Sequence, residues 1–359
     1  KLFITGGNPL KGSIKASGSK NGTLAIMAAS LLAKGRTVLS NVPKIGDIYT
    51  MVEMLRSLGA DCEINGGDVV TIDATNLLSA EAPYDLVKKM RASFTVLGPL
   101  LARKGYAKVA MPGGCDIGAR PIDFHVKGIQ ALGAHVETGH GYVEAEAGRL
   151  KGSEIYLDFP SAGATQHIMT AASLAEGVTV IQNAAMEPEI VDLAKYLTAM
   201  GAKIEGAGTT TITVVGVDEL VAVKHRIIPD RMEAGTYAVA AAITQGDVRI
   251  DDASPKNVYE RRFKYRSELQ RMGADIKQDG RSAIIKGVDR LTGAPVTATD
   301  LRAGAALVVA ALSADGESDI SGIEHIDRGY EYLVDKLIML GAEISRADSE
   351  RKGSNLCSV

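Results

Sequence analysis

Several residue types are scarce or missing in this 359-residue sequence, and each shortage excludes a class of protein. Tryptophan is absent and aromatic residues make up only 4%, which disfavours the base stacking by which many proteins bind single-stranded nucleic acid. The three cysteines, Cys62, Cys115 and Cys357, are too few for a disulfide framework and favour a reducing compartment. A net charge of −3 provides no broad field that would attract nucleic acid or an anionic membrane.

Long apolar runs are missing from the sequence as well. The first residues, KLFITGGNPLKGS, lack the basic and apolar regions of a signal peptide. The longest apolar run, residues 303–314, is shorter than the roughly 20 residues needed to span a bilayer, so it predicts a buried helix. The sequence has neither a P-loop nor a dinucleotide-binding glycine motif, and no cofactor is indicated. We therefore expect a cytoplasmic, globular protein.

What the sequence does contain is a fivefold repeat. Five segments of the form LRSLGADCEI end a predicted helix with glycine and begin a strand at once, at Gly59, Gly133, Gly201, Gly273 and Gly341. Glycine adopts the left-handed conformation that ends a helix at little cost. Five further segments, of the form AASLLAKGRTVLSNV, run from an alanine-rich helix through glycine into a strand, at Gly35, Gly105, Gly177, Gly246 and Gly316. Both series advance by about 70 residues and stay in phase, which indicates five βαβα-type modules with additional strands.

A glycine-rich segment, MPGGCDIGARPIDFH at residues 111–125, is typical of a functional loop. Its glycines would let the loop fold over a ligand and move. It holds Cys115, whose thiol reactivity depends on neighbouring cations, and Arg120, whose planar guanidinium suits a carboxylate or phosphate. A small buried cysteine without a function is the ordinary alternative.

This loop and seven other motifs resemble those of the UDP-N-acetylglucosamine enolpyruvyl transferases. The others are GSKNGTL, YDLVKKMRASF, DFPSAGATQHIM, IIPDRMEAGTY, YERRF, ATDLRAG and HIDRGYE, and the resemblance runs from residue 1 to about residue 347. It implies transfer of the enolpyruvyl group of phosphoenolpyruvate to the 3-hydroxyl of UDP-N-acetylglucosamine. That reaction is the first committed step of peptidoglycan synthesis and the target of fosfomycin. The resemblance also implies two small-molecule substrates, no cofactor, no metal, and no nucleic acid or membrane partner, and it leaves the oligomeric state open.

The fold implied by the resemblance is α/β (α+β), an inside-out α/β barrel. Six βαβαββ units form two domains of three, with helices packed inside and sheets outside. The predicted domains are residues 22–228, and residues 1–21 together with 229–359. The chain would cross between them near Ser19–Asn21 and Ile228–Arg231, and the active site would lie in the cleft between them.

Only five of the six units are visible in the sequence. The run VRIDDASPKNVYERRFKY passes directly from the first half of one unit into the second half of another, so one period of about 70 residues is missing there. In the family, that stretch carries a PGFPTD-like motif whose aspartate is the usual general-base candidate. Either the printed sequence omits a segment that the molecule has, or the protein is an impaired enzyme. We favour the first, because a deletion would leave one domain two-thirds built.

The implied reaction requires cations for a carboxylate and a phosphate, a base for the hydroxyl proton and an acid for the C3 methylene. The resemblance assigns phosphoenolpyruvate binding to Lys20, in a glycine-flanked turn, and to Asn21, Arg120, Arg302 and Arg328. The catalytic candidates are Cys115 as general acid or as an aid to product release, Lys20, and Asp300 as a proton relay. For any one of these cations alone, an ordinary surface position is the alternative.

The remaining candidates concern the nucleotide sugar. By resemblance, the uridine segment consists of Arg120, Pro121, Ile122, Asp123, Phe124 and His125. Backbone N–H groups of Ser161, Ala162 and Gly163 would hold the diphosphate at a helix start. The family assigns the rest of the pocket to Arg91, Val258 and Arg262. His125 is not expected to bind a metal, because no second ligand has suitable spacing.

Two other functions stay open. Transfer to 3-phosphoshikimate uses a related fold and similar arginines, but the PGGCDIGARP loop argues against it. A non-catalytic protein that binds a nucleotide sugar is the second, since the base of the missing unit is not in the sequence.

Overall fold

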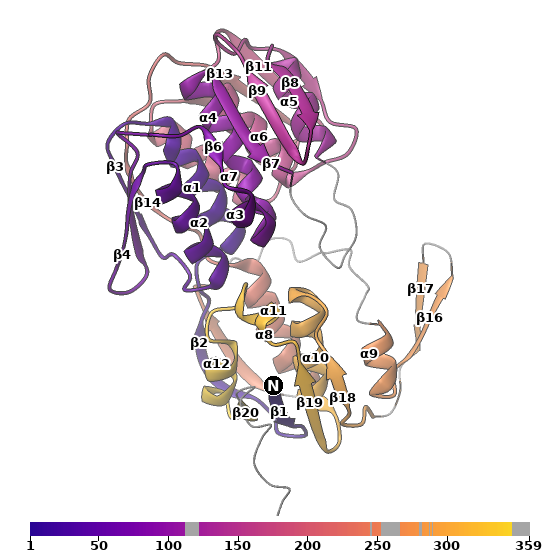
Figure 1. The fold of residues 1–359 in the computed structure, drawn as a ribbon. Helices are drawn as coiled ribbons and strands as arrows, with labels where there is room; N and C mark the ends of the chain where they lie inside the picture. The colour runs from indigo at the N-terminus through magenta and orange to yellow at the C-terminus, as the bar shows by residue number, and fades with distance from the viewer. Residues whose placement is uncertain are drawn as a thin grey trace, which may run out of the picture. The chain divides into compact units, whose positions relative to one another are not determined.

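The computed structural model describes residues 1–111, 122–244, 246–252, 266–279, 282–286, 288 and 290–346 (Figure 1). The chain divides into a larger body, Ser17–Pro229, and a smaller body, Lys1–Ala16 with Asp230–Val359. Each body has its own cluster of buried hydrophobic side chains. The domain division expected at residues 21/22 and 228/229 stays a proposal.

The larger body contains three four-stranded sheets with one shared pattern. Their strand orders are β14-β3-β5-β4, β6-β7-β9-β8 and β10-β11-β13-β12. In each, the first two strands are parallel and the other neighbours are antiparallel. The strands are β3 (Arg36–Ser40), β4 (Asp61–Asn65), β5 (Val69–Asp73), β6 (Glu81–Ala82), β7 (Tyr106–Ala110), β8 (His135–Gly139), β9 (Tyr142–Glu146), β10 (Glu154–Tyr156), β11 (Val178–Gln182), β12 (Lys203–Glu205), β13 (Thr211–Val215) and β14 (Lys224–Arg226).

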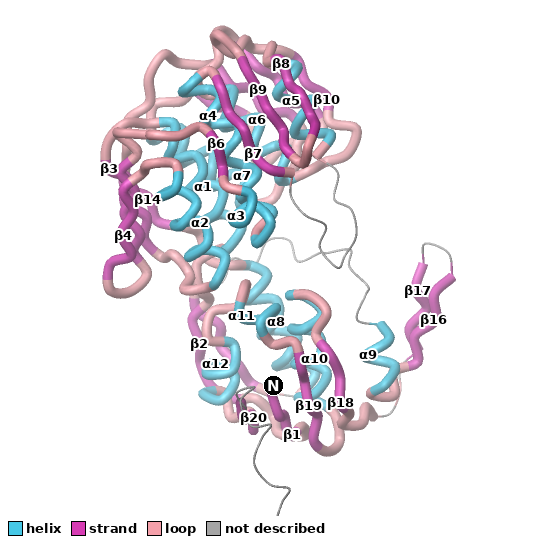
Figure 2. Tube along the Cα trace, viewed as in Figure 1, coloured by secondary structure: helices cyan, strands magenta, loops and turns pink. Residues whose placement is uncertain are grey.

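Helices fill the interior of the larger body. They are α1 (Lys20–Ala29), η1 (Ser30–Leu32), α2 (Gly46–Ser57), α3 (Tyr84–Lys89), η2 (Arg91–Val96), α4 (Leu97–Lys104), α5 (Asp123–Ala131), α6 (Ala162–Ala172) and α7 (Pro188–Ala199). Every residue from Gly22 to Ala29 in α1 and from Ala164 to Ala172 in α6 is buried, whereas strands such as β11 and β13 alternate between buried and exposed. This is the inside-out arrangement, with helices enclosed and sheets outermost (Figure 2).

In its described residues, the smaller body has one four-stranded sheet and two partial sheets of two strands each. The order β18-β19-β1-β20 repeats the pattern of the larger body, whereas β2 and β15 form only a parallel pair and β16 and β17 only an antiparallel pair. The strands are β1 (Leu2–Thr5), β2 (Lys11–Lys15), β15 (Asp247–Asp251), β16 (Asp275–Asp279), β17 (Ser282–Lys286), β18 (Pro295–Thr297), β19 (Glu317–Ser321) and β20 (Glu343–Arg346). The helices are α8 (Arg231–Ile243), α9 (Arg266–Arg271), α10 (Leu301–Ser313), α11 (Glu324–Asp327) and α12 (Leu333–Met339).

The two partial sheets are complementary halves of the repeated pattern. β2 and β15 supply the parallel pair without the antiparallel strands, and β16 and β17 supply the antiparallel strands without the parallel pair. Among the described strands, none pairs with both β15 and β17. The discontinuity therefore falls between β15 and α9, which is where the repeat loses one period in the sequence.

The predicted buried helix at residues 303–314 is confirmed by α10, in which nine residues between Ala303 and Leu312 are buried. α9 is attached to the module of α10, since the Thr297 N–H donates to Glu268 Oε2 at 2.9 Å and Met272 joins the same core. In the described part of the chain, no helix is both long and apolar enough to cross a membrane.

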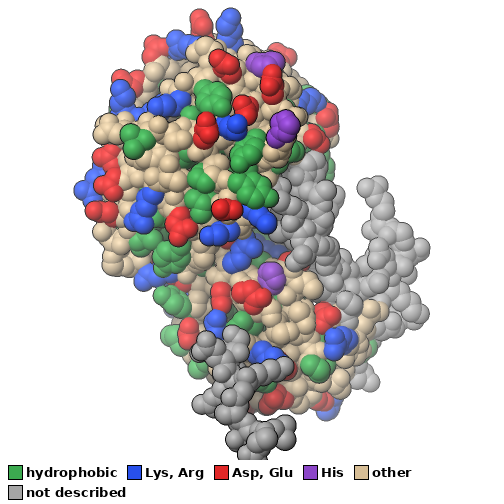
Figure 3. Space-filling model, in the orientation of Figure 1, with side chains coloured by type: hydrophobic (Ala, Val, Ile, Leu, Met, Phe, Trp, Pro, Cys, Tyr) green, Lys and Arg blue, Asp and Glu red, His purple; other side chains and the backbone are tan. Residues whose placement is uncertain are grey.

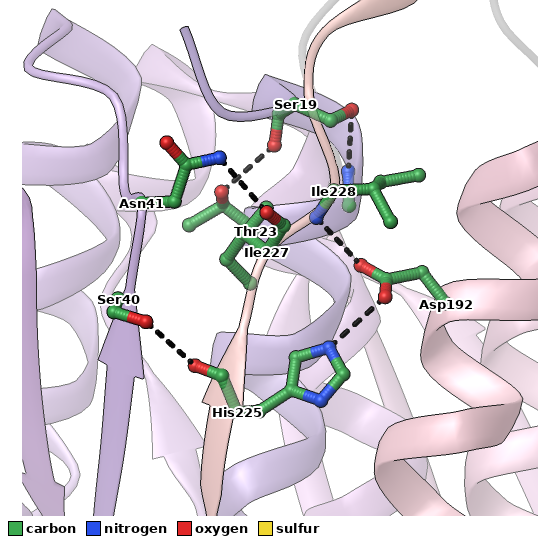
Figure 4. A network of polar contacts seen from close by, with 9 residues as sticks. Ser19, Thr23, Ser40, Asn41, Asp192, His225, Ile227 and Ile228 are labelled. Atoms are coloured by element: carbon green, nitrogen blue, oxygen red, sulfur yellow. Dashed lines mark hydrogen bonds and ion pairs between the residues drawn. The ribbon is translucent and has the colours of Figure 1, made fainter. Parts of the chain in front are cut away.

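The two ends of the larger body run side by side (Figure 4). The Ser19 N–H donates to Ile228 O at 2.7 Å, and Gly18 forms an antiparallel bridge with Pro229. Asn41 Nδ2 donates to Ile227 O at 2.9 Å. These contacts hold the backbone that leads into α1, and they therefore fix where the helix begins.

Gly18 provides a test of this close pairing. A Cβ at Gly18 would lie 1.7 Å from Asn41 O, whereas a Cβ at exposed Gly66 would have no atom within 4 Å. We expect Gly18→Ala to lower the free energy of unfolding by at least about 2 kcal/mol and Gly66→Ala to change it by less than about 1 kcal/mol. Urea unfolding of both variants measures this, and equal midpoints would contradict the close approach.

Candidate active site

Several of the described candidate residues lie at the N-terminal ends of buried helices that occupy equivalent places in the repeat. Lys20 and Asn21 begin α1, Ala162 and Gly163 begin α6, and Arg302 is the second residue of α10. Each helix start is capped by a side chain that accepts a backbone N–H. The bonds are Gly22 N to Ser19 Oγ (3.3 Å), Ala164 N to Ser161 Oγ (3.3 Å) and Arg302 N to Asp300 Oδ1 (2.8 Å). Helix N-termini carry partial positive charge, so these ends suit anionic ligands.

Lys20 differs from the expectation that it lies in a flexible turn. It is the first residue of α1, because the Ser19 cap and the paired backbone at Ile228 start the helix there. Its Nζ lies 2.6 Å from Asp47 Oδ2, and the two side chains are 17% and 5% exposed. The ammonium is therefore held in a nearly dry position by a partner on α2. No spacing in the sequence pointed to Asp47.

A second buried carboxylate supports the same helix start (Figure 4). Asp192 on α7 accepts a hydrogen bond from His225 Nε2 at 3.0 Å through Oδ1, and one from the Ile228 N–H at 3.3 Å through Oδ2. A Cβ at Gly22 would lie 3.6 Å from that Oδ2, so the carboxylate sits directly behind the first turn of α1. Sequence reasoning missed Asp192 and His225, since they are far from Lys20 along the chain.

The predicted uridine segment folds back onto α6. Ile122 precedes α5, Asp123 is exposed in its first turn, Phe124 is half-buried and His125 is buried. A Cβ at Gly163 would lie 3.3 Å from His125 Nε2, so the imidazole faces the first turn of α6. The structure thus brings together two segments that were assigned separately to the nucleotide sugar.

The candidates on the smaller body surround the start of α10. Asp300 Oδ1 accepts the N–H groups of Arg302 and Ala303 at 2.8 and 3.0 Å. The guanidinium of Arg302 donates to Tyr330 Oη at 3.0 Å and lies 5.7 Å from the centre of its ring. Arg328 follows the last residue of α11. One Asp300 oxygen is therefore engaged as a helix cap, which is a structural role in addition to the predicted proton relay.

Several predicted residues lie outside the described part of the chain. They are Cys115, Arg120, Pro121, Val258 and Arg262. The backbone of Arg91 begins η2, while its side chain is not described. In the described part, the larger body carries Lys20, Asn21 and the segments from Ile122 to His125 and from Ser161 to Gly163, and the smaller body carries Asp300, Arg302 and Arg328.

Among the described residues, no group of three or more His, Cys, Asp or Glu side chains is arranged to hold a metal ion. The face drawn in Figure 3 mixes acidic and basic side chains, in keeping with the net charge of −3. Local groups at helix ends, rather than a field of one sign, therefore supply the positive potential.

The chain matches the family model described as EPSP synthase (3-phosphoshikimate 1-carboxyvinyltransferase) over residues 4–259 and 254–337. It is 48% identical to UDP-N-acetylglucosamine 1-carboxyvinyltransferase 1 of Caldanaerobacter subterraneus subsp. tengcongensis, covering 96% of this chain and 99% of the relative. It is 47% identical to the enzyme of the same name from Halalkalibacterium halodurans, covering 99% of this chain and 97% of the relative.

Two solved structures share the fold at low sequence identity. The enolpyruvyl transferase NikO from Streptomyces tendae superposes with a TM-score of 0.82 at 24% identity, covering 96% of this chain and 98% of that one. EPSP synthase from Acinetobacter baumannii superposes with a TM-score of 0.74 at 19% identity, covering 96% of this chain and 100% of that one. Both likenesses concern the fold.

The sequence alignments also give the length and the position of the missing stretch. The alignment with the Caldanaerobacter relative has 414 positions, more than the 359 residues of this chain. With 96% of the chain aligned, roughly 70 positions of the relative face no residue here, which equals one repeat period. The two segments matched by the family model meet at residues 254–259, between β15 and α9.

Cys62 on β4 serves as a control for the thiol reactivity that is predicted for Cys115. Burial raises the pKa of its thiol to about 12, an effect that Arg56 partly opposes. Because the raised pKa keeps the thiol protonated at pH 8, we expect iodoacetamide to leave Cys62 unmodified in the folded protein and to modify it in urea. Peptide mapping by mass spectrometry measures both. Modification of folded protein at the rate of a free thiol would contradict the burial.

Proposed function

Because the chain belongs to the EPSP synthase family of enolpyruvyl transferases, we propose that it transfers the enolpyruvyl group of phosphoenolpyruvate to the 3-hydroxyl of UDP-N-acetylglucosamine and releases phosphate. The observation that carries this is the identity of 47–48% to relatives named for that reaction, over nearly their whole length. The reaction begins peptidoglycan synthesis, and we place it in the cytoplasm. Transfer to 3-phosphoshikimate is not favoured, since the EPSP synthase structure is only 19% identical.

The positive helix ends fit the chemistry of this transfer. The sugar oxygen bonds to C2 of phosphoenolpyruvate while a proton goes to C3; the adduct then loses a C3 proton and expels phosphate. Negative charge is concentrated on a carboxylate and a phosphate throughout, so fixed donors and cations stabilise bound substrate and transition state. Lys20 is fixed by Asp47 before any ligand arrives, which reduces the ordering needed on binding.

The remaining groups come from the loop at residues 111–125 and from several other segments, by assignment from the motifs. We assign Cys115 as general acid or as an aid to product release, and Arg120 and Arg328 as contacts for phosphoenolpyruvate. Arg302 and Asn21 complete that set, and Arg91, Val258 and Arg262 complete the sugar pocket. These assignments rest on the motif resemblance, and the positions of Asn21, Arg302 and Arg328 at or beside helix ends are compatible with them.

The missing period bears on the general base. In the family, the stretch missing from the printed sequence contains the PGFPTD-like aspartate; in a protein that truly lacks this stretch, Asp300 is the remaining candidate and we expect little activity. Asp300 is 9% exposed, and in the described part both hydrogen bonds to its carboxylate are accepted by Oδ1, which leaves Oδ2 for a proton transfer.

A coupled phosphate-release assay tests the function. Purified protein, with its intact mass measured on the same preparation, is given phosphoenolpyruvate and UDP-N-acetylglucosamine together and each alone. We expect phosphate only with both substrates. Saturable binding of UDP-N-acetylglucosamine with no phosphate release would instead identify an impaired homologue, and release with 3-phosphoshikimate would identify the sister reaction.

Lys20→Gln tests the placement of the ammonium. Removal of one pre-positioned charge should lower kcat/KM by at least about 100-fold. The control is Lys203→Gln, an exposed lysine on β12, which should retain wild-type kinetics. Thermal unfolding of both variants shows whether the fold is kept. A folded Lys20→Gln protein with unchanged kcat/KM would remove Lys20 from the site.

Cys115→Ser tests the loop assignment. We expect fosfomycin to add its mass once to the wild-type protein, at Cys115, and not at all to the variant, because only a thiolate near bound ligand is reactive enough. Whole-protein mass spectrometry with peptide mapping measures this. An adduct that persists in Cys115→Ser would show that another thiol is the target.

A further inference from the structure

Two buried histidines meet behind the predicted nucleotide segment. His125 on α5 and His167 on α6 are 6% and 1% exposed, and their Nδ1 atoms lie 3.1 Å apart. The edge of Phe94 packs on His125 at a centroid distance of 5.5 Å, and its ring lies 5.9 Å from His167. A Cβ at Gly98 would lie 2.7 Å from His167 Cδ2, so α4 packs closely against that ring.

This contact requires one ring to donate and the other to accept. If both imidazoles carried a proton on Nδ1, their two N–H groups would point at each other. Burial, and the neighbouring His125, also lower the pKa of His167 well below its usual value. His167 is therefore neutral, with one proton to place.

The surroundings of His167 decide where that proton lies. Its Nε2 is buried and has no hydrogen-bond partner in the described structure. A buried N–H without an acceptor is rarer and costlier than a buried lone pair without a donor. The proton therefore belongs on Nδ1 of His167, which donates to Nδ1 of His125. His125 must then carry its own proton on Nε2.

The Nε2 atom of His125 faces the first turn of α6. It lies 3.3 Å from where a Cβ of Gly163 would be, beside the N–H groups of the Ser161–Gly163 helix start. We propose that His167 is a positioning residue that fixes the tautomer of His125, so that His125 Nε2–H donates to a phosphate or carbonyl oxygen of the bound uridine diphosphate group. The inference rests on the proposed function for the identity of the ligand.

Three variants separate this role from simple core packing. His167→Asn keeps an N–H donor close to the position of Nδ1, whereas His167→Leu fills the space without one. The matched control is Tyr196→Phe, which removes a different buried hydrogen bond of the larger body, that between Tyr196 Oη and Thr37 Oγ1 at 3.3 Å. Urea unfolding of all three variants measures how much stability each one loses. A kinetic effect that follows from lost stability can then be told apart from an effect on binding.

We expect His167→Leu to raise KM for UDP-N-acetylglucosamine about tenfold, while kcat and KM for phosphoenolpyruvate stay within about twofold. His167→Asn should recover most of the lost affinity, and Tyr196→Phe should change no kinetic constant. Equal effects of His167→Leu on both substrates, or no recovery in His167→Asn, would overturn the proposal. If turnover is absent, calorimetric Kd values for UDP-N-acetylglucosamine replace KM.

A spectroscopic measurement tests the tautomers without reference to activity. Long-range ¹H–¹⁵N correlation spectra of the wild-type protein distinguish Nδ1–H from Nε2–H imidazoles. The proposal requires Nδ1–H at His167 and Nε2–H at His125, and the opposite assignment would overturn it. Wild-type protein that binds no uridine nucleotide would instead defeat the proposed function, whereas binding that is equal in wild type and His167→Leu would defeat this inference alone.

Discussion

On the larger body, the described part of the candidate site depends on one backbone hydrogen bond, which the Ser19 N–H donates to Ile228 O at 2.7 Å. It joins the two ends of the larger body and thereby determines where α1 begins. Ser19 then caps the helix and Lys20 becomes its first residue, facing Asp47. Asp192 holds the Ile228 N–H from the other side, so the pairing is braced by a buried carboxylate that is itself bonded to His225. A shift of this backbone would move the ammonium with it.

The repeat explains why the candidate groups gather where they do. The alanine-rich helices α1, α6 and α10 are buried along most of their length, so the candidate groups that they carry lie at an end. The N-terminal end carries unsatisfied N–H groups and positive potential, and a single capping residue leaves others available to a ligand. Repetition of the module thus multiplies helix ends with positive potential without requiring a surface of one charge sign.

Much of this could be predicted from the sequence, because the decisive patterns are local. The glycines predicted to end helices, such as Gly59 and Gly201, have φ values of +98° and +113°, and the left-handed conformation is confirmed at all five. Gly246 is different. Glycine is required there because a Cβ would clash with Leu10 O, and not because of a positive φ. The partners Asp47, Asp192 and His167 could not be found, because no spacing rule links buried side chains from separate modules. The turn expected at Lys20 was wrong because the cap at Ser19 depends on Ile228, which is distant in sequence.

Lys20 and His125 are held in the same way. Each donor is held by a buried partner on another helix, Asp47 or His167, so its orientation is fixed before a ligand binds. Asp300 is also fixed, through the N–H groups of α10, and the described part of the module before α10 consists of β16, β17 and α9. The larger body, with three complete sheets, therefore carries most of the residues that we assign to the nucleotide sugar. Turnover depends on whether the two partial sheets of the smaller body hold Asp300 and Arg302 as firmly as a complete module would.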